Sequence, residues 1–157
     1  MELEIFDLEG IPVFNQDMEN HPAEKVKEFK AKIRAADAIL IATPEYNYSI
    51  PGVLKNAIDC ASRPYGDNVF EHKPVAIMGA SGGMIGTARA QYHLRQCFVF
   101  LNCFALNQPE VMVSFATEKI DKNGKVTDQK TRELIKEMLE HLVEWTRRLK
   151  PAGAKNA

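Results

Sequence analysis

Hydrophobic and polar positions along this chain fall into alternating blocks that predict strands and amphipathic helices in turn. Residues 38–42 and 75–78 are short, continuous apolar runs, which is the pattern of parallel strands buried on both faces. Elsewhere, apolar residues recur at spacings of three and four, which is typical of helices that cover a sheet. We expect such helices at about 22–36, 51–62 and 87–101, followed by a long helix that begins near residue 128.

Two further stretches predict strands with less regular patterns. Residues 3–6 form a short apolar-leaning run before Asp7, and we expect them to be the first strand of the sheet. Residues 103–106 and 111–113 are expected to form one strand that is interrupted or extended around Pro109. Strands that alternate with helices indicate βα units, so the predicted fold class is α/β with a parallel sheet.

Length and composition agree with a single domain. With 157 residues, 45% of them apolar, the chain can bury one core of ordinary size but not two. We place the domain at residues 1–150 and expect residues 151–157 to form a disordered tail.

The charge balance and the scarce residue types exclude several classes of function. The net charge of −1, from 20 basic and 21 acidic residues, gives no field that would attract nucleic acid or an anionic membrane. The three cysteines lack CxxC spacing and no two histidines lie within four residues, so neither a disulfide framework nor a metal site is expected. Because there is no long apolar run and no signal segment, we expect a cytoplasmic protein without a membrane partner.

Polar and aromatic residues are concentrated in the loop that follows the first buried strand. This loop, residues 43–49, carries a carboxylate at Glu45, an amide at Asn47 and two tyrosines, Tyr46 and Tyr48. Ligands bind beyond the carboxyl ends of strands in open parallel sheets. Flat rings beside a group that donates and accepts hydrogen bonds would suit a planar heterocycle with a polar edge. On spacing alone, an equal alternative is that the tyrosines cap the core and that Glu45 is solvated.

A glycine-rich loop, residues 79–87, follows the second buried strand and opens a helix. It contains four glycines, and glycine permits close approach of a ligand to backbone N–H groups. The loop matches neither the GxGxxG motif nor a P-loop. Taken alone, it is better explained as a tight turn between a strand and a helix. Its position, equivalent to that of the tyrosine-bearing loop, favours a ligand that the two loops share.

The helix expected at 87–101 carries a strip of polar and aromatic residues that includes Arg89, Tyr92 and His93. Such a strip is either a solvated face or a subunit interface, where tyrosine and arginine are enriched. We expect self-association as a dimer or tetramer. His93 has no partner at a spacing that would indicate a catalytic base, and Cys60 lies on an apolar helix face. We expect His93 to belong to this strip and Cys60 to be a packing residue.

Three blocks of sequence together resemble one known family. Residues 43–49 (TPEYNYS), 51–59 (PGVLKNAID) and 79–91 (GASGGMIGTARAQ) are similar to the signature segments of the NADPH-dependent FMN reductases. The similarity extends over nearly the whole chain. The resemblance implies a flavodoxin-like three-layer sandwich that binds FMN and takes electrons from NADPH. It also implies a small-molecule acceptor, such as a quinone, an azo dye, a nitro compound or a metal oxyanion.

Carried over by position, the resemblance places residues of both loops beside the isoalloxazine ring of FMN. These residues are Pro44, Glu45, Tyr46 and Asn47 from the first loop and Ala80, Ser81, Gly82 and Gly83 from the second. Hydride chemistry belongs to the flavin, so the protein has to hold the ring, tune it through hydrogen bonds and leave one face open. The resemblance therefore implies no general acid or base for hydride delivery, and we assign no catalytic residue.

The chain departs from the family pattern at its N-terminus. Family members open with a strand and a Gly/Ser-rich loop that wraps the FMN phosphate, and we expect this N-terminal βα unit, with its central strand, to be missing. The leading hypothesis is an FMN-dependent NAD(P)H oxidoreductase. One alternative is a catalytically impaired, truncated relative that acts only as an assembly or flavin-binding protein. Another is a flavin-binding electron carrier that does not react with nicotinamide.

Overall fold

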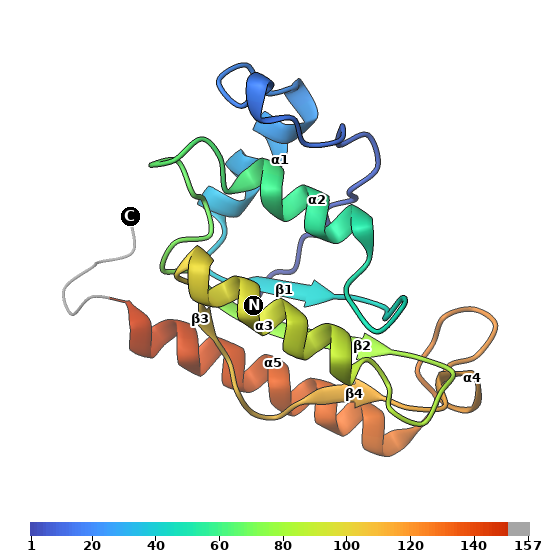
Figure 1. Cartoon of the computed structure of the whole chain (residues 1–157). Coiled ribbons are helices and arrows are strands. Elements are labelled where there is room, and N and C mark those ends of the chain that lie inside the picture. The colour runs from blue at the N-terminus through green and yellow to red at the C-terminus, as the bar shows by residue number, and fades with distance from the viewer. Residues whose placement is uncertain (151–157) are drawn as a thin grey trace.

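The computed structural model describes residues 1–150, which form a parallel sheet between two layers of helices (Figure 1). The four strands are β1 (Ile39–Ala42), β2 (Pro74–Ala80), β3 (Phe104–Ala105) and β4 (Val111–Val113). β1 pairs with one edge of β2, whereas β3 and β4 pair with the beginning and the end of its other edge. The predicted strand around Pro109 is therefore two short strands that share one edge of β2.

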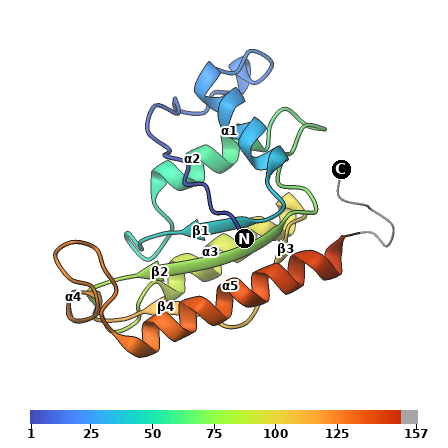
Figure 2. The ribbon, with the colours of Figure 1, turned by 180° about the vertical axis from the view of Figure 1, so that it is seen from behind.

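The helices match the periodic segments of the sequence closely. They are α1 (Glu24–Ala35), α2 (Gly52–Ala61), α3 (Ala88–Leu101), the short α4 (Ala116–Lys119) and the long α5 (Gln129–Leu149), and a 3-10 turn, η1 (Gln16–Met18), precedes them. Helices α1, α2 and α3 lie on one side of the sheet and α5 runs across the other, as the two opposite views show (Figure 1, Figure 2). The flavodoxin-like three-layer sandwich is thus confirmed.

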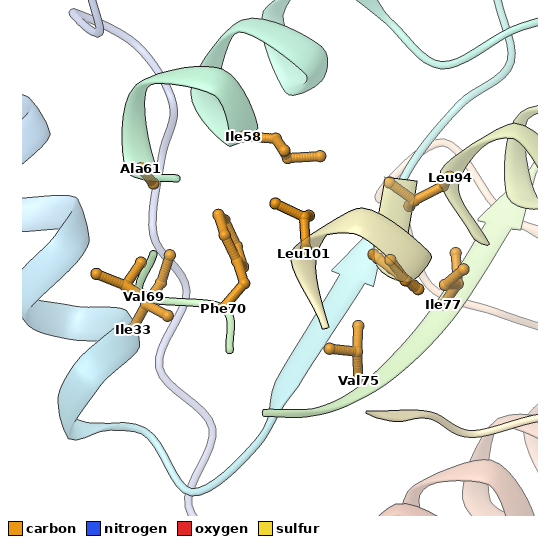
Figure 3. Packing of buried hydrophobic residues seen from close by; sticks show 10 residues of the cluster. Ile33, Ile58, Ala61, Val69, Phe70, Val75, Ile77, Leu94 and Leu101 are labelled. Atoms are coloured by element: carbon orange, nitrogen blue, oxygen red, sulfur yellow. The ribbon is translucent and has the colours of Figure 1, made fainter. Parts of the chain in front are cut away.

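Alternation along β2 builds both halves of the core. Val75 and Ile77 point into a cluster with residues of α1, α2 and α3, which Figure 3 shows from close by. Ala76 belongs to a second cluster, with Val111 of β4 and Met138 of α5. All five side chains are at most 3% exposed. Because successive side chains of a strand point to opposite faces, one strand holds both helical layers to the sheet.

The strand predicted at residues 3–6 is wrong. Residues 1–8 adopt no regular structure, and Ile5 is 87% exposed. The Phe6 ring lies against Phe29 of α1, with ring centroids 4.9 Å apart, and the Lys25 ammonium lies 4.3 Å from the centre of the Phe6 ring. Phe6 therefore packs against a helix rather than in the sheet.

The expectation that the strand at 38–42 is buried on both faces is also wrong. Ile39, Leu40 and Ile41 are only half-buried, and Ala42 is exposed. Within residues 1–150, β1 is bonded to a strand on its β2 side alone, so its outer edge is less well covered than β2. In the same described part of the chain, no helix is long and apolar enough to cross a membrane.

Gly79 lies near the end of β2, where three segments meet too closely for a side chain. A Cβ atom there would lie 2.2 Å from Thr87 Oγ1 and 2.3 Å from the carbonyl oxygen of Thr43. The N–H of Thr43 donates to the Met78 carbonyl over 3.0 Å, which continues the β1–β2 pairing into the first loop. Both loops that the sequence singles out are therefore packed on the bare backbone at Gly79.

Replacing Gly79 by alanine tests this close contact. The added methyl group forces Thr87 or the Thr43 backbone to move, and such overpacking costs about 1–3 kcal/mol of unfolding free energy. Gly52→Ala is the matched control, because a Cβ at Gly52, the first residue of α2, meets nothing within 4 Å. We expect urea denaturation to show a lower midpoint for Gly79→Ala and an equal or slightly higher one for Gly52→Ala. Equal stability of the two variants would contradict the contact.

Candidate functional site

Three loops meet at the carboxyl ends of β1, β2 and β4. Neighbouring parallel strands have their carboxyl ends on the same side of a sheet, and in Figure 1 these ends lie on the side of α4. The N–H of Ser81 donates to the Val113 carbonyl over 2.9 Å, and the N–H of Arg89 donates to Glu45 over 3.0 Å. The structure therefore brings the two predicted loops together and adds a third, after β4.

The first loop folds into a tight hairpin. Tyr46 and Ser49 exchange both backbone hydrogen bonds, over 3.0 and 2.9 Å. The two residues between them, Asn47 and Tyr48, have φ angles of 49° and 66°, as a two-residue turn of this kind requires. Asparagine tolerates this conformation, but tyrosine adopts it uncommonly. Tyr46 and Tyr48 are 63% and 66% exposed, so the alternative in which they cap the core is wrong.

The carboxylate of Glu45 is turned away from solvent and onto the start of α3. It accepts hydrogen bonds from the N–H groups of Arg89 and Ala90, over 3.0 and 3.2 Å, and from Arg89 Nη1 over 3.1 Å. The Glu45 side chain is 9% exposed, so the expectation of a solvated carboxylate is wrong. Thr87, the N-cap residue of α3, makes no side-chain capping bond, and Glu45 supplies the missing acceptor.

Arg89 connects this carboxylate to the hairpin. The Cζ atom of its guanidinium lies 3.7 Å from the centre of the Tyr48 ring, within the range of a cation–π contact. The ring of Tyr48 is thus held from one side while most of its surface stays exposed. Ser49, at the end of the hairpin, lies 3.0 Å from His93 Nδ1 through its hydroxyl oxygen.

The glycine loop is tied to its neighbours at both ends and open in the middle. The Ser81 hydroxyl accepts from the Gly83 N–H over 3.0 Å, and the Gly83 carbonyl accepts from the Phe115 N–H over 3.1 Å. Packing explains Gly79 and also Gly86, whose φ is +63° and whose Cβ would lie 2.9 Å from the Met112 backbone. A Cβ at Gly82 would meet nothing within 4 Å, so packing does not require this glycine. The tight-turn explanation therefore covers only part of the loop.

The third loop contains a residue that the sequence did not reveal. Phe115 has φ 50° and ψ 48°, a left-handed conformation that a bulky residue rarely adopts, and its side chain is 43% exposed. Its strain is held by the bond to Gly83 and by the Ala116 N–H, which donates to the Ser81 carbonyl over 3.0 Å. The only sequence signal was its place after a predicted strand, and the limits of that strand were uncertain.

A buried glutamine of α3 supports the end of the glycine loop. Gln91 of α3 is 0% exposed, and its Nε2 donates to Thr87 Oγ1 and to the Val111 carbonyl, each over 2.9 Å. Its Oε1 is buried without a partner among the described residues. Gln91 thereby links the last residue of the loop, Thr87, to β4.

The cysteine thiols are shielded by burial, and the described residues offer no metal site. Burial raises the pKa of the Cys103 thiol to about 12, and burial also raises the pKa values of Cys60 and Cys97. All three thiols are therefore protonated, and weakly nucleophilic, at neutral pH. Within residues 1–150, no group of three or more His, Cys, Asp and Glu side chains could hold a metal ion.

A parallel α/β sandwich with a glycine loop and an aromatic hairpin at the carboxyl ends of adjacent strands places the chain in the class of flavodoxin-like α/β proteins. The model of the family NADPH-dependent FMN reductase matches residues 1–118, and the chain belongs to this family.

Individual relatives with related printed activities are similar to this chain over most of its length. The chain is 55% identical over 153 residues to an NAD(P)H-dependent FMN reductase of Pseudomonas aeruginosa, covering 96% of this chain and 81% of that protein. It is 44% identical over 141 residues to a 2-hydroxy-1,4-benzoquinone reductase of a Burkholderia species, covering 90% and 77%. The solved structure of FerB, a flavoenzyme NAD(P)H:(acceptor) oxidoreductase from Paracoccus denitrificans, is similar with a TM-score of 0.85 and 36% identity, covering 94% of this chain and 81% of that one.

The support that Gln91 gives to the loop can be tested against a second glutamine of the same helix. Gln91→Ala removes two hydrogen bonds and leaves a cavity, and we expect a loss of about 2–4 kcal/mol of unfolding free energy. Gln96→Ala, at an exposed position of α3, should change it by less than about 0.5 kcal/mol. Chemical denaturation of the three proteins makes the comparison. Equal losses in both variants would refute the supporting role of Gln91.

Proposed function

We propose that this protein holds FMN between the tyrosine hairpin and the glycine loop and works as an NAD(P)H oxidoreductase that reduces quinones or similar small acceptors. The observation that carries the proposal is the pairing of two loops where the strands end: the first carries two exposed tyrosines, the second has open space over Gly82, and Glu45 bonds the first loop to the helix that follows the second. This is the place where α/β proteins bind ligands. Family membership and the printed activities of the Pseudomonas and Burkholderia relatives support the same conclusion.

The residues present fit the ring of a flavin. The exposed rings offer flat apolar surface, Asn47 offers a donor and an acceptor, and the glycines allow close approach to the backbone. The proposed binding residues are Pro44, Glu45, Tyr46, Asn47, Ala80, Ser81, Gly82 and Gly83. Glu45 belongs to this set through its backbone, because its carboxylate is already bound to α3.

The chemistry of FMN determines which tasks are left to the protein. When bound, FMN supplies the exchange of two electrons between reduced nicotinamide and an acceptor. The hairpin and the glycine loop orient the ring and exclude water from the side that they cover. No side chain has to take or give a proton for hydride delivery, so we assign no catalytic residue. A small acceptor reaches the uncovered side.

Flavin binding is tested with two tyrosines in similar settings. Tyr48 and Tyr65 are 66% and 72% exposed, and each lies under an arginine, at 3.7 and 4.0 Å. Tyr65 lies in the connection before β2, at the opposite edge of the sheet. We expect titration with FMN, followed by quenching of flavin fluorescence, to show binding that Tyr48→Leu weakens about tenfold, because Tyr48 is part of the turn that also contains Asn47 and follows Tyr46. Tyr65→Leu should bind like the wild type.

Turnover separates the proposed enzyme from the two alternatives. Oxidation of NADPH by the FMN-loaded protein, followed at a fixed quinone concentration, is expected only if the bound flavin reacts with nicotinamide. Flavin binding without NADPH oxidation would instead identify an electron carrier or a binding protein. No flavin binding at all would refute the proposed function.

We also propose that the chain forms a homodimer or homotetramer through α3. Tyr92, Val99 and Phe100 are 50%, 83% and 69% exposed, and their spacing of seven and eight residues places them along one face of the helix. Exposed apolar residues gathered on one face mark association sites.

The association through α3 is tested by adding charge to that face. We expect light scattering to give a dimer or tetramer for the wild type and a monomer for the double variant Val99→Lys/Phe100→Lys. Val13→Lys is the control, because Val13 is 87% exposed and lies between Pro12 and Phe14, which are hydrogen-bonded to Asn56 of α2. A wild type that is monomeric at micromolar concentration would refute the proposal.

We further propose that residues 1–150 act as one domain in the cytoplasm. The helical layers on both faces of the sheet share β2, which favours a single folding unit. The three cysteines are free, as is usual for proteins in a reducing compartment. The tail predicted at residues 151–157 lies outside the described residues.

A further inference from the structure

We propose that the carboxylate of Glu45 is a positioning group, which fixes the tyrosine hairpin against α3 and acts on the ligand through Arg89 and Tyr48. This inference deepens the proposed function and rests on it for the nature of the ligand. It assigns the Glu45 side chain a task different from the one that the family resemblance implies, which is contact with the flavin ring.

The first step of the argument is the number of bonds that the carboxylate makes. One oxygen, Oε2, accepts the N–H groups of Arg89 and Ala90, and the other, Oε1, accepts Arg89 Nη1. These N–H groups belong to the first turn of α3, where backbone donors have no partner within the helix. A negative charge is also favoured at this end of the helix dipole. With both oxygens engaged and 9% of the side chain exposed, the carboxylate is committed to α3.

The second step is the link from α3 to the hairpin. The guanidinium that pairs with Glu45 also lies over the Tyr48 ring, at 3.7 Å from its centre. Tyr48 needs such support, since its φ of 66° is unfavourable for a side chain with a Cβ. Glu45 holds Arg89, Arg89 holds the ring, and the ring belongs to the turn that begins one residue after Glu45.

The third step is what happens when the charge is removed. Glu45→Gln keeps the size of the side chain but weakens the acceptors for the two amides and leaves Arg89 without an anionic partner. The guanidinium is then free to leave the Tyr48 ring, and the hairpin loses its anchor. The effect on a ligand is therefore indirect and passes through Tyr48.

A double-mutant cycle distinguishes this chain of contacts from direct binding by Glu45. We expect Glu45→Gln and Tyr48→Leu each to raise the dissociation constant of FMN about tenfold, and the double variant to raise it about tenfold as well. If the carboxylate contacts the flavin on its own account, the two losses multiply to about a hundredfold. A hundredfold loss, or no loss in Glu45→Gln, would overturn the proposal.

Hydrogen exchange in the ligand-free protein gives a second readout that does not depend on flavin. The amides of Tyr46 and Ser49 are bonded to each other's carbonyl groups, and we expect them to exchange about tenfold faster in Glu45→Gln. Glu24→Gln is the control, since Glu24 also lies in a first helical turn and pairs with a lysine, Lys27, but sits on α1. Unchanged exchange at the hairpin would overturn the proposal even if FMN binds.

Hydrogen exchange also distinguishes failure of the positioning role of Glu45 from failure of the proposed flavin function. Faster exchange in a protein whose wild type does not bind FMN would leave the positioning role intact and refute the proposed function. Should Glu45→Gln not fold, Arg89→Met replaces it, because it breaks the link to Tyr48 but leaves the bonds from Glu45 to the helix amides. We expect Arg89→Met to speed hydrogen exchange at the amides of Tyr46 and Ser49 and to raise the dissociation constant of FMN about tenfold. The amide of Ala90 should stay protected from exchange.

Discussion

The central position of β2 is the constraint on which the rest of the structure depends. This strand is bonded along both edges, and its side chains fill a core on each face of the sheet. A strand in this position must be apolar on both sides, and it can carry polar function only beyond its ends. The chemistry-bearing residues therefore gather in the loop after Ala80 and in the loops that follow the strands on either side of it.

The site is held by polar contacts that cross between these loops rather than by packing within each. Glu45 reaches α3, Gln91 reaches β4, and the backbone around Gly83 is bonded to Phe115. Each contact joins elements that β2 has already placed side by side. The result is a rigid frame around an open surface, which suits a protein whose cofactor carries the reaction and needs orientation more than side-chain chemistry.

The sequence predicted the periodic parts of the fold well, because burial of one face leaves a local pattern. All four helices expected from spacing are present, and Val75, Ala76 and Ile77 of the run at 75–78 are buried, as predicted, while Met78 is half-buried. Contacts between distant residues leave no such pattern. The run at 3–6 could not reveal that Phe6 packs on α1, and the motif around Glu45 could not reveal that its carboxylate binds amides 44 and 45 residues further along the chain. Phe115 was missed because its strained backbone depends on hydrogen bonds to Ser81 and Gly83.

The cap that Glu45 provides for α3 makes the stability of this helix end depend on a distant part of the chain. Most helices are capped by a neighbour in sequence and can start from their own ends. The first turn of α3 is instead capped by a residue of the loop that follows β1, whose strand is paired with β2. The end of α3 is therefore stabilised by contacts between residues 44 and 45 positions apart in the sequence. Loss of the Glu45 carboxylate is therefore expected to weaken both the N-terminal turn of α3 and the hairpin.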